Sequence, residues 1–166
     1  MAQIMLQDAF DQAGLDVTVT STGVSDEEAG NRIDYRAART LTRHGYEGGD
    51  QHHAAQVTEQ HLADADLVLP MTAYHARAVR QLARANATTG AKGGGATPEI
   101  TGAAPEIIMI RAFDPAAPRI TDESNEYLLD HDDPWYGGQQ QFEDCFAQLQ
   151  AAIPGVVAFV RNQLGS

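Results

Sequence analysis

Asp66-Leu67-Val68-Leu69-Pro70-Met71 is a compact apolar run with polar residues on either side. A run of this kind predicts a strand that is buried on both faces, as in a parallel sheet. Residues 73–85 follow at once with good helix formers, and residues 106–110 form a second apolar run. A shorter strand is expected at 17–19, where valine and threonine alternate. Strands that alternate with helices predict the α/β class with a mainly parallel sheet.

Further helices are predicted where apolar residues recur at helical spacing, over residues 1–13, 34–43, 58–63 and from 139 onwards. Gly14 is placed to end the first helix, and Asp34 to cap the start of the second. The first helix has no side-chain cap, so its leading N–H groups need solvent or an anion. Pro154 should kink the final helix or start a second segment. Residues 86–102, rich in Gly, Ala and Thr, are expected to form a mobile surface loop.

The run Asp132-Asp133-Pro134-Trp135-Tyr136-Gly137-Gly138 is predicted to form a rigid turn. Pro134 fixes its own φ and pushes Asp133 out of the helical region, while the glycines let the backbone reverse. A carboxylate held beside two flat rings suits a general acid that waits next to an aromatic leaving group. Asp-Pro and Gly-Gly are also common in plain loops, where the two aromatics would simply anchor the chain. Local chemistry leaves both interpretations open.

The composition describes a single acidic globular domain over residues 1–166. A formal net charge of -12 argues against nucleic acid or an anionic membrane as the main partner, because a polyanion would be repelled. Cys145 is the only cysteine, so neither an intramolecular disulfide nor a cysteine-based zinc site is expected. The sequence has no apolar stretch of about 18 residues and no signal-peptide pattern, so the cytoplasm is the expected location.

No metal or cofactor is expected, although Asp130-His131-Asp132-Asp133 and His52-His53 are candidate ligands. Adjacent residues on a turn cannot all face one ion, and the paired histidines lack helical ligand spacing. The acidic residues between 122 and 133 are predicted instead to form a solvated face. Such a face would repel acidic peptides.

Seven short pieces follow one another along nearly the whole chain: Met1-Ala2-Gln3, Thr20-Ser21-Thr22-Gly23, Ile33-Asp34-Tyr35-Arg36, Arg43-His44-Gly45, His52-His53-Ala54-Ala55-Gln56, Leu67-Val68-Leu69-Pro70-Met71 and Asp133-Pro134-Trp135-Tyr136-Gly137-Gly138. Each piece alone is weakly specific, but in this order they resemble the low-molecular-weight protein-tyrosine phosphatase family. The resemblance implies a three-layer α/β/α fold with a mainly parallel four-stranded sheet. It also implies hydrolysis of phosphotyrosine through a phosphocysteine intermediate.

The resemblance assigns a role to each matching site residue. Asp133 matches the general acid that protonates the phenolic oxygen and then acts as the base for water. Trp135 and Tyr136 match aromatics that flank the substrate ring. Ser21 and His52 match residues that support the phosphate loop. Phosphotyrosine proteins, and a tyrosine kinase as a partner, are implied in the same way.

The family's Cys-x-x-x-x-x-Arg-Ser signature and the strand before it are absent from these residues. Cys145 does not replace the nucleophile, because Ala151 stands where the arginine should be and the cysteine lies among core positions. We therefore expect this chain to be inactive. Either the reading frame extends upstream of Met1, or the chain is a shortened pseudophosphatase that binds phosphotyrosine or another protein.

Loss of the family's central strand would leave two inner sheet edges open, which predicts low stability or self-association. For a binding module, Arg36 or Arg39 is a candidate to attract an anion to the start of the first helix. An arsenate reductase, a relative on the same fold, needs further reactive cysteines that this chain lacks.

Overall fold

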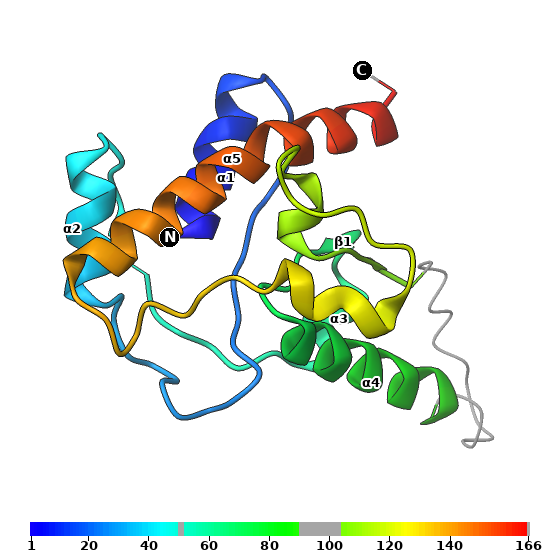
Figure 1. Ribbon diagram of the computed structural model, residues 1–166. Coiled ribbons are helices and arrows are strands. Elements are labelled where there is room, and N and C mark those ends of the chain that lie inside the picture. The colour runs from blue at the N-terminus through cyan, green and yellow to red at the C-terminus, as the bar shows by residue number, and fades with distance from the viewer. Residues whose placement is uncertain (50–51, 90–103, 166) are drawn as a thin grey trace.

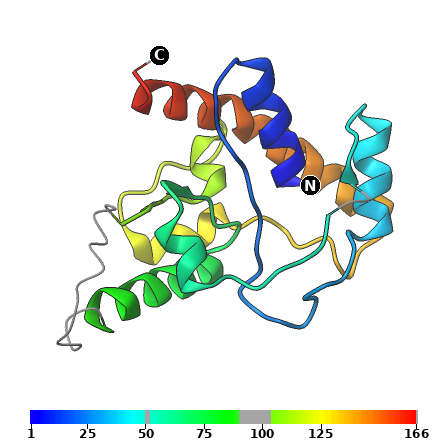
Figure 2. The ribbon, with the colours of Figure 1, turned by 180° about the vertical axis from the view of Figure 1, so that it is seen from behind.

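The computed structural model describes residues 1–49, 52–89 and 104–165. Its elements, in chain order, are α1 (Ala2–Gln12), α2 (Tyr35–Arg43), α3 (Glu59–Ala63), β1 (Leu67–Val68), α4 (Ala73–Thr89), β2 (Glu106–Ile107), the 3-10 helices η2 (Ile110–Phe113) and η3 (Glu123–Leu129), and α5 (Gln139–Gln163). Figures 1 and 2 show α1 and α2 packed along α5, with α3, α4 and the strands grouped on the other side of the molecule.

The long helix α5 organises the larger of two hydrophobic clusters. This α5 cluster contains the buried residues Met5, Leu6, Phe10, Leu15, Leu41, Ile110, Phe146, Leu149, Ala152, Ile153 and Val156. Pro154 neither ends α5 nor starts a separate helix, because one helix runs through it. Gly155 permits a close approach here, since a Cβ on it would collide with the carbonyl oxygen of Phe113 in η2. A second, smaller group, the α4 cluster, consists of Ala76, Met109 and Leu129.

The predicted parallel pairing is confirmed, although the strands are shorter than expected. Leu67 pairs with Glu106 in a parallel register. The main-chain N–H of Glu106 donates to Asp66 O at 2.9 Å, and that of Ile108 donates to Val68 O at 3.1 Å. Both residues of β1 are half-buried rather than buried on both faces. The second apolar run gives only two strand residues, because the chain turns into η2 at Ile110.

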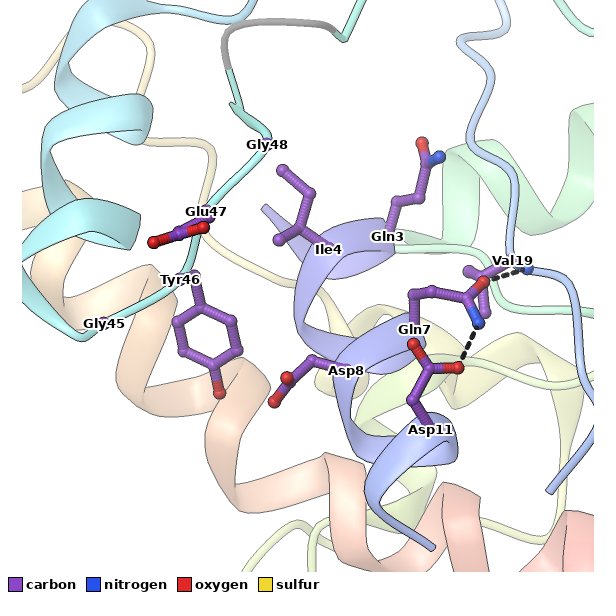
Figure 3. A pocket seen from close by; sticks show the side chains of 10 residues that line it. All are labelled: Gln3, Ile4, Gln7, Asp8, Asp11, Val19, Gly45, Tyr46, Glu47 and Gly48. Carbon is purple, nitrogen blue, oxygen red and sulfur yellow. Dashed lines mark hydrogen bonds between the residues drawn. The ribbon is translucent and has the colours of Figure 1, made fainter. Parts of the chain in front are cut away.

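The strand predicted at 17–19 is wrong, because this segment belongs to no strand. Main-chain hydrogen-bonding groups of this segment are paired with a side chain instead of with a neighbouring strand. Gln7 Nε2 donates to Val17 O at 2.9 Å, and Gln7 Oε1 accepts from Val19 N at 2.9 Å. Figure 3 shows the amide of Gln7 between Val19 and Asp11, so that one residue of α1 fixes the segment.

Helix ends follow local chemistry closely. The Asp34 side chain accepts a hydrogen bond from Arg36 N, as predicted for the cap of α2. Gly14 follows α1 with a φ of 67°, in the left-handed region that glycine favours. The loop predicted over 86–102 begins too early, because α4 continues to Thr89. Residues 90–102 of that prediction lie outside the described residues. No helix in the described ranges is long and apolar enough to cross a membrane.

Candidate active site

Residues 130–138, named here the acid loop, connect η3 to α5. The turn predicted within it is present: Gly137 N donates to Pro134 O at 2.9 Å, and Asp133 Oδ1 accepts from Trp135 N at 2.9 Å. Asp133 is exposed, and Trp135 and Tyr136 are 45% and 96% exposed. The aromatics therefore do not serve mainly to anchor the loop in the core. The loop presents a carboxylate beside two rings that solvent reaches.

The first end of the acid loop is fastened where β1, α4 and η2 meet. His131 N donates to Met71 O at 2.9 Å, just beyond the carboxyl end of β1. Asp130 Oδ1 accepts from Ala73 N at 2.6 Å and so holds the start of α4. Arg111 Nη1 donates to Asp130 O at 2.9 Å. Parallel α/β folds place their ligands at the carboxyl ends of strands, and the acid loop begins there.

The second end of the acid loop is fastened to α2. Arg36 Nη1 donates to Gly137 O at 2.6 Å. Gln139 Nε2, in the first turn of α5, donates to Thr40 Oγ1 at 2.7 Å. Arg36 is also bound to Asp34, with 2.7 Å between Nη2 and Oδ2, so its guanidinium serves the loop and the helix cap. These contacts fix the guanidinium of Arg36 between α2 and the acid loop.

Ser21, predicted to support a phosphate loop, lies at the first turn of α1. Its Oγ donates to Gln3 Oε1 at 2.7 Å, and its side chain is exposed. Met1 is the N-cap residue of α1 and supplies no side-chain hydrogen bond to the leading N–H groups. Free N–H groups at a helix start favour an anion.

His52 and Cys145 share the electrostatic surroundings of this helix start. Burial, with smaller effects from the positive α-amino group and His53, lowers the pKa of His52. Burial raises the pKa of the Cys145 thiol to about 11, and the charges of Asp133 and Asp132 act in the same direction. The α-amino charge opposes that rise. The start of α1, His52, Cys145 and the acid loop are therefore electrostatic neighbours.

Cys145 is a poor nucleophile in this setting, because a thiol with a pKa of about 11 is protonated at neutral pH. Its Sγ lies 3.9 Å from Nδ1 of His131. His131 is 6% exposed, and burial, with Arg111 nearby, lowers its pKa to about 4. A neutral imidazole gives no charge that would stabilise a thiolate. These surroundings support the interpretation of Cys145 as a packing residue.

The prediction that the acidic residues between 122 and 133 form a solvated face holds only in part, because some of them are bound to other side chains or main-chain groups. Glu126 is 6% exposed and accepts from Arg80 Nη1 at 2.7 Å. Asp122 caps η3 through Ser124 N, and Asp130 holds α4. Sequence reasoning missed Arg80 and the link from Arg36 to Gly137, because partners 46 and 101 positions apart leave no local pattern.

A cleft of about 480 Å³ runs along the side of α1, away from Asp133 and the exposed aromatics. Figure 3 shows the carboxylates of Asp8, Asp11 and Glu47 and the ring of Tyr46 around it. It is lined by three carboxylates and no cationic side chain, so a phosphate ester would be repelled. Within the described ranges, no three His, Cys, Asp or Glu side chains are grouped to hold a metal ion.

Comparisons with known proteins identify a family. A family model described as low molecular weight phosphotyrosine protein phosphatase matches residues 1–90. Low molecular weight protein-tyrosine phosphatase A of Mycobacterium tuberculosis is 36% identical over 166 residues, covering 99% of this chain and 85% of the relative. A low molecular weight protein-tyrosine-phosphatase of Streptomyces coelicolor is 31% identical over 99% of this chain and 87% of its own.

Solved structures show the same fold. The crystal structure of YfkJ from Bacillus subtilis superposes with a TM-score of 0.72 at 19% identity, over 98% of this chain and 86% of that chain. The likeness confirms the predicted α/β class. Within the described residues, the sheet of this chain has two strands.

Proposed function

Because the chain belongs to the low molecular weight phosphotyrosine protein phosphatase family, we propose that it acts on phosphotyrosine, with Asp133 as the general acid and base. One observation carries the proposal: the acid loop is fastened at both ends and presents a carboxylate beside two exposed aromatic rings. Phosphotyrosine proteins are the corresponding partners.

The chemistry of the substrate explains why this loop suits it. A phenolate is a poor leaving group in water at neutral pH, since the phenol has a pKa of about 10. In the phosphocysteine mechanism that the family resemblance implies, the thiolate of the signature cysteine, a role that Cys145 does not fill, would form a bond to phosphorus as the P–O bond to tyrosine breaks. Protonation of the bridging oxygen by Asp133 would then release a neutral tyrosine side chain. The resulting carboxylate then takes a proton from the water that attacks the phosphocysteine. The phosphate leaves, and the cysteine and Asp133 are restored to their starting states.

Trp135 and Tyr136 would flank the substrate ring during these steps. Their exposure supports this role, because a ring that faces solvent can stack on a ligand without moving out of the core. Ser21 and His52 would support the phosphate-binding segment. Their position beside the uncapped start of α1 supports this assignment.

Residues 1–166 alone are proposed to bind phosphotyrosine without hydrolysing it. Cys145 is their only cysteine, and its raised pKa and its place among core residues unsuit it for attack on phosphorus. The loss of a catalytic nucleophile costs about a million-fold in rate. This binding role is the second candidate function.

The deciding experiment compares hydrolysis of a phosphotyrosine peptide with that of the same peptide carrying phosphoserine. It uses the protein purified from its native cells and recombinant residues 1–166. Selective hydrolysis of the phosphotyrosine peptide is the result expected for the first candidate function. Binding of that peptide without turnover is the result expected for the second. Equal hydrolysis of both peptides would contradict the proposed substrate. Turnover by residues 1–166 that survives Cys145→Ser would contradict the proposed phosphocysteine chemistry.

A further inference from the structure

Arg36 holds one end of the acid loop in a defined place. Its Nη1 donates to Gly137 O at 2.6 Å, and the two residues are 101 positions apart. Its Nε and Nη2 donate to the two carboxylate oxygens of Asp34, at 3.0 Å and 2.7 Å. Its guanidinium carbon lies 4.6 Å from the centre of the Phe142 ring in α5. A single side chain therefore joins α2, the acid loop and α5.

The contacts of Arg36 are of the kind that fix geometry. Both members of its ion pair are largely sheltered, with side chains 17% and 16% exposed. A bidentate pair between arginine and a carboxylate sets the plane of the guanidinium, which then aims Nη1 at Gly137. The hydrogen bond from Arg36 lowers the pKa of Asp34, so the carboxylate is ionised at neutral pH. Asp34 also caps α2, so the cap and the clamp share one group.

A second link secures the same junction. Gln139 Nε2 donates to Arg36 O at 3.1 Å and to Thr40 Oγ1 at 2.7 Å. The link begins one residue beyond the acid loop and fixes where α5 starts. Between the two anchored ends, Asp133, Trp135 and Tyr136 are exposed. The turn has hydrogen bonds of its own, which Gly137 N donates to Pro134 O and Trp135 N donates to Asp133 Oδ1. The direction of Asp133 therefore depends on where the two ends are held.

We propose that Arg36 is a positioning residue, which clamps the acid loop through Gly137 so that Asp133, Trp135 and Tyr136 face a bound substrate together. The catalytic part of this proposal rests on the proposed phosphatase function, while the clamp itself does not. A lysine at position 36 keeps the charge but has no planar fork, so it cannot serve Asp34 and Gly137 in the same way. Arg36→Lys is therefore the sharpest variant.

Trp135 gives a direct readout, because it is the only tryptophan and it lies in the acid loop. The test measures acrylamide quenching of its fluorescence in residues 1–166 for the parent protein, Arg36→Lys and Arg36→Ala. Arg39→Ala is the matched control, since Arg39 is exposed on the same helix. We expect quenching to rise about two-fold in both Arg36 variants and to stay unchanged in the control, as a released loop opens to solvent.

Global stability separates a clamp from a general structural role. Melting temperatures are measured on the same samples, and quenching is compared well below the lowest melting temperature. A quenching constant for Arg36→Lys equal to that of the parent protein would overturn the proposal. So would an increase of the same size in Arg39→Ala. The Asp34→Asn variant should raise quenching as Arg36→Lys does, because the guanidinium of Arg36 loses the carboxylate that orients it.

The catalytic readout uses the protein as native cells produce it. Misplacing a catalytic group by about 1 Å costs up to about 100-fold in rate, so Arg36→Lys should lower kcat on a phosphotyrosine peptide by about 10- to 100-fold. On a substrate whose leaving phenol is strongly acidic, kcat should fall much less, since that phenolate can leave without being protonated. An equal loss on both substrates would contradict the positioning role. If the parent protein has no turnover, the proposed function fails, and the Trp135 measurement still decides the clamp.

Discussion

The α5 cluster and the α4 cluster are held together in different ways. The α5 cluster buries eleven apolar residues, with Phe146 stacked on His44 at a centroid distance of 3.9 Å. The α4 cluster buries three. Its neighbourhood relies on polar links instead, among them the buried pair of Arg80 and Glu126 and the cap that Asp130 gives to α4. Apolar burial stabilises one side, and satisfied polar groups stabilise the other.

The acid loop connects the side of the molecule that holds the α4 cluster to the side that holds the α5 cluster. It begins at Asp130, tied to α4, and ends at Gly137, tied to α2 beside α5. Figure 1 shows this segment crossing from η3 to the start of α5. The direction of Asp133 therefore depends on both kinds of stabilisation.

The largest effect is expected in the α5 cluster. Phe146→Ala should lower the free energy of unfolding by about 4 kcal/mol, because it removes a fully buried ring and leaves a cavity. Leu129→Ala, in the α4 cluster, should cost about 2 to 3 kcal/mol. Urea denaturation of both variants measures the difference. A larger cost for Leu129→Ala would reverse the ranking of the two sides.

Breaking the polar link on the α4 side comes next. Arg80→Met should cost about 3 kcal/mol, since it leaves Glu126 buried without its charge partner. The double variant Arg80→Met with Glu126→Leu should recover most of that loss, because the uncompensated charge is gone. Arg77→Met is the control on the exposed part of the same helix. If urea denaturation shows that the double variant is no more stable than Arg80→Met, Glu126 is not a buried carboxylate that depends on Arg80.

A pH effect is expected from His131 at the junction of the two sides. Its pKa is lowered from 6.5 to about 4, chiefly by burial. Between these values the unfolded chain binds the proton more readily than the folded chain, so stability rises with pH across this window and is lost as pH falls through it. The melting temperature should drop by several degrees from pH 6.5 to pH 4. His131→Asn should flatten that part of the profile, and an unchanged slope would contradict the assignment.

The smallest effect is expected where one side chain replaces a strand. Gln7→Met should cost about 1 to 2 kcal/mol, because Val17 O and Val19 N lose their hydrogen-bond partner. The amide of Val19 should also exchange its hydrogen faster. Gln12→Met is the control, since Gln12 is exposed and donates to Asp8 on the same helix. Equal exchange rates in the two variants would show that Gln7 does not hold the segment.

Local chemistry predicted the helices and the turn well. Asp34, Gly14 and Pro134 each act through their own backbone or through a neighbour within a few residues, so their effects can be derived from short stretches. The seven ordered motif pieces predicted the family, which the comparisons confirm.

Strand lengths and long-range links could not be derived in this way. A strand exists only where another main chain lies beside it, and Val17 and Val19 bond to Gln7 instead. In the sequence, Arg36 and Gly137 stand 101 positions apart, and only the folded chain brings them together. Glu126 stood within an acidic run, and only the packing of η3 on α4 buries it against Arg80.

The most direct test of the account is the effect of Asp133→Asn on kcat in the protein produced from its native gene in its own cells. A general acid contributes about 100- to 10,000-fold, so we predict a loss of that size on a phosphotyrosine peptide. The loss on dinitrophenyl phosphate, whose leaving group needs no proton, should be far smaller. Unchanged turnover of the phosphotyrosine peptide in Asp133→Asn would contradict the role assigned to the acid loop.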